Sequence, residues 1–219
     1  MKIEQTGIKI LYEGGQGEIV EKKSRFIATV RKIESEEEAL AFIAEMKKKY
    51  WDARHNCYAF VLGDKHQLQR CSDDGEPQGT AGRPMLDVLL KEDIHDVAVV
   101  VTRYFGGTLL GTGGLVRAYQ GATLAGLSNS VIVERQKGET LTVRVDYNNI
   151  GKVQYILAKK GILVMEAEYA QAVELQVMVP IEELSHLQEE LTEATNGTAA
   201  FEHGAKSDFA VIDGKIIKF

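Results

Sequence analysis

The sequence predicts an α+β protein of two domains, residues 1–136 and 137–219. Three observations favour this. Strand-like apolar runs and amphipathic helical segments alternate along the chain. A polar break with one glycine lies at residues 136–139. The charge balance also changes there, because 18 Lys and Arg stand against 19 Asp and Glu before the break and 8 against 13 after it.

The first domain alternates strands and helices. Ser35, followed by three glutamates, predicts an N-capped helix with an acidic first turn. Pro84 suits the first turn of a later helix, and glycines open the last helix. The expected elements are short strands within 8–20, a strand at 24–33, a helix at 35–50, a hairpin of strands 56–62 and 67–71, an irregular loop at 72–84, a helix at 84–91, a single strand at 94–104, a helix at 111–129 and a closing strand at 131–133.

The second domain has a more regular order. Strand, helix, strand, strand, helix and strand follow one another, which is the ferredoxin-like βαββαβ module. A hairpin around Asp213-Gly214 is expected after it. The expected ranges are a strand at 140–146, a helix at 148–160, strands at 162–169 and 172–179, a helix from Pro180 to about Ala194, a strand at 198–202 and the hairpin at 209–219.

The composition excludes several classes of protein. Hydrophobic residues make up 44% of the chain and only three prolines occur, so a long disordered region is not expected. No apolar stretch approaches the length of a membrane span, and the N-terminus lacks an apolar signal core, so we expect a cytoplasmic protein without a membrane partner. Two cysteines, Cys57 and Cys71, are too few for a disulfide scaffold and are expected to be reduced. The net charge of −6 excludes a protein that is basic throughout.

A glycine loop follows the apolar strand at 94–104 and opens the next helix. Free backbone N–H groups, a helix N-terminus and flanking arginines are favourable for an anion. The loop lacks the lysine of a nucleotide-hydrolysing loop, and its glycines could instead serve a tight turn and close helix packing. The candidate anion-binding residues are Arg103, Gly107, Gly111, Thr112, Gly113, Gly114 and Arg117.

The acidic loop at 72–84 holds three carboxylates, Asp73, Asp74 and Glu76. They could hold a magnesium ion or act as an acid and base. We favour the alternative that they cap turns and pair with Arg83, Arg103 or Arg117.

His55 lies at the start of a strand, two residues before Cys57, so both side chains share a face. A general base, an anion ligand or, more commonly, a structural histidine are the alternatives for His55. No catalytic residue and no metal ligand set is identified.

Four segments together resemble the IMPACT family over residues 20–130. They are Ser24–Ala28, His55–Ala59, Asp73–Pro84 and Thr102–Tyr119. The resemblance implies a fold like the second domain of ribosomal protein S5, a sheet with helices on one face. The second half resembles the extra domain of bacterial members, which is similar to domain V of the translocation elongation factor.

The resemblance also implies a role in translation. Eukaryotic relatives bind the co-activator of a starvation-responsive kinase and keep that kinase quiet. Their N-terminal partner-binding domain has no counterpart in this sequence, so we expect only the shared domain to carry over.

We therefore expect a translation-linked regulator that is not an enzyme and needs no cofactor. It would bind RNA, the ribosome or a translation factor through an anion-binding surface that includes Arg83. One alternative is an enzyme for a phosphorylated or carboxylated small molecule, which requires a pocket where Asp73, Glu76, Arg103 and Gly113 converge. Another is a protein-interaction module that uses the acidic second domain.

Overall fold

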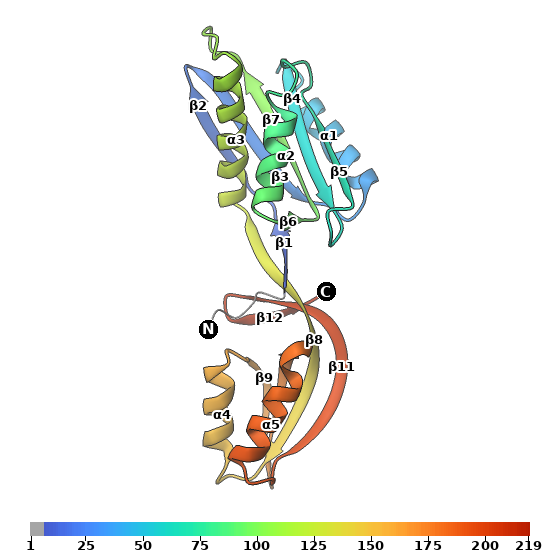
Figure 1. Ribbon diagram of the computed structural model, residues 1–219, viewed down its shortest axis with the longest axis vertical. Coiled ribbons are helices and arrows are strands. Elements are labelled where there is room, and N and C mark those ends of the chain that lie inside the picture. The colour runs from blue at the N-terminus through green and yellow to red at the C-terminus, as the bar shows by residue number, and fades with distance from the viewer. Residues whose placement is uncertain (1–6) are drawn as a thin grey trace. The chain divides into compact units, whose positions relative to one another are not determined.

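The computed structural model describes residues 7–219, which divide into two compact units (Figure 1). One unit comprises residues 8–133, and the other comprises residues 134–219 together with Gly7. Each unit combines β-sheet and α-helix, so the predicted α+β class is confirmed. No helix of the described residues is long and apolar enough to cross a membrane.

The N-terminal unit contains a five-stranded antiparallel sheet in the order β2-β3-β7-β4-β5. The strands β1 and β6 pair in parallel outside this sheet. The elements are β1 (Ile8–Glu13), β2 (Gln16–Glu21), β3 (Ser24–Lys32), α1 (Glu36–Lys49), β4 (His55–Leu62), β5 (Leu68–Ser72), α2 (Gly82–Lys91), β6 (Ile94–His95), β7 (Val97–Tyr104) and α3 (Thr112–Ser128).

Helices cover both faces of this sheet (Figure 1). On one face, α2 and α3 pack on strand residues such as Cys57 and Val99. On the other, α1 packs on the alternate residues Phe60, Ala98 and Val100. The expectation of helices on one face only is therefore wrong for this chain. The central strand β7 is apolar at successive positions, and such a strand needs both of its faces covered.

Two local predictions for this unit have different outcomes. Ser35 caps α1 as expected, since its hydroxyl oxygen accepts a hydrogen bond from the Glu38 amide at 3.2 Å. The single strand expected at 94–104 is wrong. It is divided at Asp96, which has a φ of 54° and accepts the Ile33 amide through its carbonyl oxygen at 3.1 Å. This break separates the parallel pair from the main sheet.

The C-terminal unit has the element order βαββαβ followed by a short strand. Its sheet is antiparallel throughout and has the order β9-β10-β8-β11-β12. The hairpin around Asp213-Gly214 is confirmed. The elements are β8 (Val131–Val145), whose first three residues belong to the N-terminal unit, α4 (Ile150–Lys159), β9 (Val164–Tyr169), β10 (Val173–Pro180), a 3-10 turn (Ile181–Glu183), α5 (Leu184–Ala194), β11 (Ala200–Ile212) and β12 (Lys215–Lys218).

The polar break expected at 136–139 lies inside the continuous strand β8. These residues pair with β11, and residues 138–139 also pair with β10. Gly138 serves packing rather than a turn, since a Cβ there would lie 2.5 Å from the ring of Phe209. Apolar residues of α4 and α5, including Val153, Leu157 and Leu187, complete a core with the strands of this unit.

Candidate anion-binding site

The acidic loop between β5 and α2 is organised by Asp73. One oxygen of its carboxylate accepts hydrogen bonds from the amides of Ala81 and Gly82 at 3.0 and 2.9 Å. The other accepts the Gly79 amide at 2.8 Å. Because Gly82 is the first residue of α2, Asp73 satisfies amides at the start of a helix that has no side-chain cap from its own N-cap residue. A metal ion bound here would compete with three backbone N–H groups for the carboxylate oxygens of Asp73.

Asp74 is also engaged by protein groups. Its carboxylate lies 2.5 Å from Lys47 Nζ of α1 and accepts the Asn56 amide at 2.7 Å. Its carbonyl oxygen lies 2.9 Å from His55 Nδ1. A carbonyl oxygen only accepts, so the proton of this hydrogen bond lies on Nδ1. Asp74 therefore orients the His55 ring at the start of β4.

Glu76 lies at the centre of a buried polar network. Its Oε1 atom is 2.6 Å from Arg103 Nη1 and accepts the Tyr119 hydroxyl at 2.8 Å. The Cys57 Sγ lies 3.3 Å from that hydroxyl and 3.0 Å from the Asp73 carbonyl oxygen. The Phe26 ring meets Tyr119 edge to face, with centroids 5.2 Å apart. The network joins α3, β4, β7 and the acidic loop.

Burial decides the protonation of two members of this network. It raises the pKa of the Cys57 thiol, and the nearby Glu76 and Asp74 charges act in the same direction. Burial likewise raises the pKa of Tyr119. Both groups therefore remain protonated at neutral pH. Since a thiolate is the nucleophilic form of cysteine, Cys57 is not activated for covalent catalysis, and its position beside His55 serves packing.

A cavity of about 270 Å³ opens at the end of the sheet where β7 ends and β4 begins. Arg103 forms part of its wall, and its Nε atom is buried without a hydrogen-bond partner among the described residues. Leu109 of the glycine loop is 81% exposed at the rim. The lining residues are Asp52, Arg54, His55, Arg103, Tyr104, Phe105 and Leu109.

The acidic and basic side chains around the cavity differ in whether they have a partner. Asp52 accepts the Tyr104 hydroxyl at 2.8 Å, whereas Arg54 is exposed and forms no ion pair within residues 7–219. Phe105 is an exposed aromatic ring at the same place. The cavity therefore offers a free cation beside apolar surface.

The glycine loop brings further cations to this end of the sheet. Gly106 packs on the turn between β2 and β3, since a Cβ on it would lie 2.0 Å from the Lys23 carbonyl carbon. Lys22 and Lys23 in that turn are exposed and have no ion pair among the described residues. The exposed Arg117 of α3 lies beside Gly113, with Nη1 3.6 Å from where a Cβ would stand.

The N-terminus of α3 is uncapped. Gly111, with a φ of 73°, is its N-cap residue and has no side chain to bind the first amides. The first helical hydrogen bond at this end joins the Leu115 amide to the Gly111 carbonyl oxygen at 2.9 Å. The preceding amides of Thr112, Gly113 and Gly114 have no partner within the helix. This exposed end presents backbone donors and a positive dipole.

The structure thus brings together most of the predicted site residues. Glu76 pairs with Arg103 in the buried network, and Asp74 of the same acidic loop binds His55. Arg103 and Leu109 of the glycine loop both line the cavity. Arg83 does not line the cavity and forms an ion pair with Asp87 at 2.8 Å. Of the four residues that the enzyme interpretation requires to converge, only Arg103 lines the cavity.

Sequence reasoning missed four residues at this site: Lys22, Lys23, Lys47 and Arg54. Lys47 lies at the end of the helix expected at 35–50, and its partner Asp74 is 27 residues away in the sequence. Arg54 is the neighbour of the candidate residue His55, just before the strand expected at 56–62. This position was the only feature of the sequence that pointed to Arg54.

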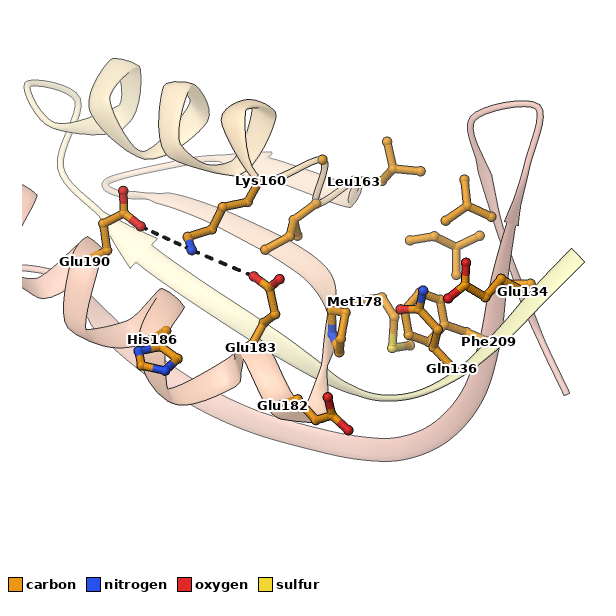
Figure 2. A pocket seen from close by; sticks show the side chains of 16 residues that line it. Glu134, Gln136, Lys160, Leu163, Met178, Glu182, Glu183, His186, Glu190 and Phe209 are labelled. Carbon is orange, nitrogen blue, oxygen red and sulfur yellow. Dashed lines mark ion pairs between the residues drawn. The ribbon is translucent and has the colours of Figure 1, made fainter. Parts of the chain in front are cut away.

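A larger cavity, of about 1140 Å³, lies in the C-terminal unit (Figure 2). Its lining includes Glu134, Glu182, Glu183 and Glu190 and only one lysine, Lys160. That lysine lies 3.3 Å from Glu190 and 3.7 Å from Glu183. The cavity therefore has an excess of negative charge, which disfavours phosphate groups.

Comparison with known proteins extends over both units. Residues 22–127 match the Impact N-terminal domain, and residues 143–198 match a domain of unknown function (DUF1949). The chain is 43% identical to the IMPACT family member YvyE of Bacillus subtilis over 192 residues, 88% of each chain. It is 35% identical to the IMPACT family member YigZ of Escherichia coli over 81% of this chain and 88% of YigZ. A solved structure described as the crystal structure of an hypothetical protein is similar at a TM-score of 0.57 and 31% identity. That similarity covers 89% of this chain and 96% of the other.

Proposed function

This chain belongs to the IMPACT family, and on that premise we propose that it is a non-enzymatic, translation-linked regulator that binds RNA. The binding surface is the glycine-loop surface, defined here by Lys22, Lys23, Arg54, Phe105, Leu109, the first turn of α3 and Arg117. The observation that carries the proposal is the set of exposed cations around this loop that form no ion pair with any residue of 7–219.

The cations of this surface are not neutralised by the acidic loop. Asp73 binds amides, Asp74 binds Lys47, and Glu76 binds Arg103, so none of these carboxylates neutralises the exposed cations. Phosphate oxygens are suitable partners for such cations and for the free amides of α3. Arg83 is left out of the surface, because Asp87 engages its guanidinium.

Exposed aromatic and apolar groups favour single-stranded RNA over a small anion. Phe105 lies at the cavity, and the exposed Trp51 directly precedes its lining residue Asp52. Bases stack on exposed aromatic rings, while neighbouring cations follow the phosphate backbone.

The fold of the C-terminal unit supports the link to translation. Its βαββαβ order and antiparallel sheet are consistent with a ferredoxin-like, elongation-factor-like module.

The test is fluorescence anisotropy with a labelled single-stranded RNA of about 12 nucleotides, together with co-sedimentation with ribosomes. We expect Arg54→Ala and Arg117→Ala each to weaken RNA binding. Each should also make the negative slope of log K against log salt concentration shallower by about 0.7, which is the effect of one lost phosphate contact on a single strand.

Arg70→Ala is the matched control, since Arg70 is an exposed arginine that pairs with Glu36 at 2.6 Å in the same unit. It should leave both the affinity and the slope unchanged. Absence of binding to RNA and ribosomes at low salt, or equal losses in all three variants, would refute the proposal.

A further inference from the structure

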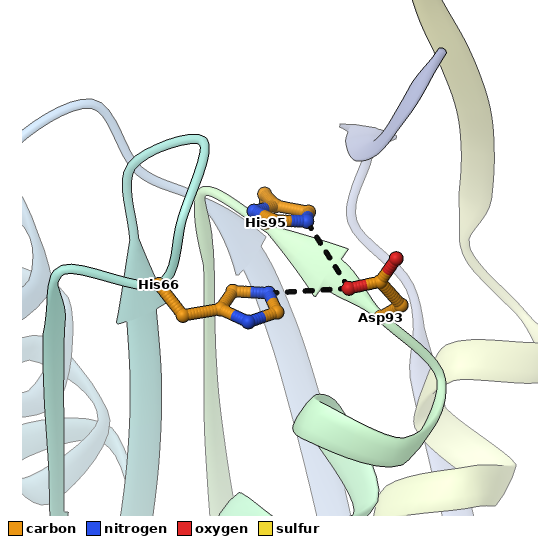
Figure 3. A group of neighbouring side chains, drawn as sticks. All are labelled: His66, Asp93 and His95. Carbon is orange, nitrogen blue, oxygen red and sulfur yellow. Dashed lines mark ion pairs between the residues drawn. The ribbon is translucent and has the colours of Figure 1, made fainter. Parts of the chain in front are cut away.

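A cluster of His66, Asp93 and His95 lies at the other end of β4 from the glycine-loop surface (Figure 3). His66 belongs to the β4–β5 connection, Asp93 follows α2, and His95 is in β6. Their nearest ligand atoms all lie within 4.8 Å of one another. We propose that these three side chains form a binding site for a divalent transition metal ion of the zinc type, independent of RNA binding.

The separations of the donor atoms suit one small ion. Asp93 Oδ1 lies 3.4 Å from His95 Nε2 and 3.7 Å from His66 Nε2. Bonds of about 2.0–2.1 Å in tetrahedral geometry place two ligand atoms about 3.3 Å apart. The two imidazole rings are stacked, so one of them must rotate for all three atoms to reach a common ion. A fourth position remains for water, since the Asp93 side chain is mostly exposed.

The second observation is the state of the two imidazole rings. His66 Nε2 is buried and has no hydrogen-bond partner among the described residues. A buried polar atom without a partner is unfavourable, and a metal ion would satisfy it.

His95 is held in the tautomer that a metal requires. Its side chain is only 6% exposed, and its Nδ1 lies 2.9 Å from the Gly63 carbonyl oxygen, to which it donates. In the neutral ring Nε2 then carries the lone pair, and Nε2 is the atom that lies 3.4 Å from Asp93 Oδ1. A backbone acceptor behind a metal-binding imidazole is the usual arrangement for fixing the ring.

Gly63 also connects the two segments that supply the ligands. Its carbonyl oxygen accepts the His66 amide at 2.9 Å as well as His95 Nδ1, and its own amide donates to Asp96 Oδ1 at 3.0 Å. These hydrogen bonds hold the two segments together without an ion. Two imidazole nitrogens and one carboxylate oxygen form a ligand set with borderline-soft nitrogen donors, which favours zinc over magnesium or calcium.

The alternative is that the two rings have a purely structural role. The His66 and His95 rings are stacked with centroids 3.9 Å apart and an interplanar angle of 19°. Under this alternative the rings would pack on each other, and Asp93 would bind no ion. The two interpretations differ in whether added zinc binds with a stoichiometry of one and stabilises the protein.

The experiment uses the full chain after treatment with a chelator. Zinc is titrated by calorimetry, thermal unfolding is followed with and without zinc, and Co²⁺ is added to record the visible spectrum of the bound ion. We expect one ion per chain, a Tm that rises with free zinc and a tetrahedral Co²⁺ spectrum. Magnesium should have no effect on Tm.

The variants are His66→Asn and Asp93→Asn. Their backbone φ values are 51° and 54°, a region that asparagine tolerates, so the metal-free proteins should unfold at temperatures near that of the unmodified chain. Each should weaken zinc binding by about tenfold or more.

Two controls exclude other ligands. His186→Asn removes an exposed histidine of α5 that lies 3.9 Å from Glu189. Cys71→Ser removes the exposed thiol. Both variants should bind zinc like the unmodified chain. The proposal is overturned if zinc fails to raise Tm, or if His66→Asn and Asp93→Asn bind zinc as tightly as the controls do.

Discussion

Arg103 Nη1 and Glu76 Oε1 lie 2.6 Å apart in a pair whose side chains are only 7% and 3% exposed. The guanidinium also lies over the Phe26 ring, 5.4 Å from its centroid. The ion pair and the Phe26 ring therefore shield both charges from water. This pair joins the acidic loop to the wall of the cavity.

Glu76→Gln should destabilise the protein strongly. The variant leaves the charged Arg103 buried without its counter-charge, which costs about 3–5 kcal/mol in the free energy of unfolding. Urea denaturation measures this loss. Glu45→Gln, which breaks the exposed pair with Arg31, is the control and should cost less than about 1 kcal/mol. Equal losses in both variants would contradict the assignment of Glu76 to a buried pair.

The Arg31–Glu45 pair should stabilise the protein only when Glu45 is ionised. Its hydrogen bond with Arg31 lowers the pKa of Glu45 in the folded state. The stabilisation is therefore complete above the pKa of the unfolded chain and is lost as pH falls through the folded value. The difference in unfolding free energy between the unmodified chain and Glu45→Gln should shrink as pH is lowered below about 4.5. A difference that grows towards acid pH would contradict this.

The two cysteines should react very differently with a thiol reagent. Cys57 is buried and its raised pKa keeps it protonated, whereas Cys71 is exposed. Burial also raises the pKa of Cys71 moderately, so its labelling should accelerate as pH rises above neutral. Mass spectrometry should find one labelled site, Cys71, in the native chain and two in denaturant. Rapid labelling of native Cys57 would contradict the buried network.

Gly113→Ala should stabilise the fold and weaken RNA binding. A Cβ at Gly113 meets only Arg117 Nη1, at 3.6 Å, so the methyl group fits and lowers the conformational entropy of the unfolded chain. The expected gain is about 0.5–1 kcal/mol. The same methyl group stands where RNA phosphate would approach the backbone.

Gly151→Ala is the matched control for Gly113→Ala, because Gly151 is likewise the second residue of a helix and has open space around its Cβ position. It should stabilise the chain to a similar extent and leave anisotropy titrations with RNA unchanged. Unaltered RNA binding by Gly113→Ala would remove the first turn of α3 from the proposed surface.

Local patterns predicted the elements that depend on neighbouring residues. Ser35 and the glutamates after it determine the start of α1, and Gly111 marks the start of α3. The helix α1 was predicted, but its position on the second face of the sheet was not, although the uninterrupted apolar sequence of β7 indicates that both faces are covered. Gly138 was interpreted as a break, because its role in accommodating Phe209 depends on a residue 71 positions away.

The candidate site was predictable only in part, for the same reason. The glycine loop and the acidic loop are continuous in sequence and could be recognised as motifs. Their partners Lys47 and Tyr119 come from helices that sequence alone does not place. His66 and Asp93 are 27 positions apart with no metal-ligand spacing between them, so only folding makes the cluster visible.

Asp73 has a consequence for the kinetics of binding. Because three backbone amides already converge on its carboxylate, the acidic loop has its shape without any ligand. Since Glu76 of this loop holds Arg103 in the cavity wall, a partner that binds the glycine-loop surface meets a wall that is already ordered and loses little free energy there. Association should be fast and governed by electrostatic attraction, so that salt slows the on-rate while the heat-capacity change on binding remains small.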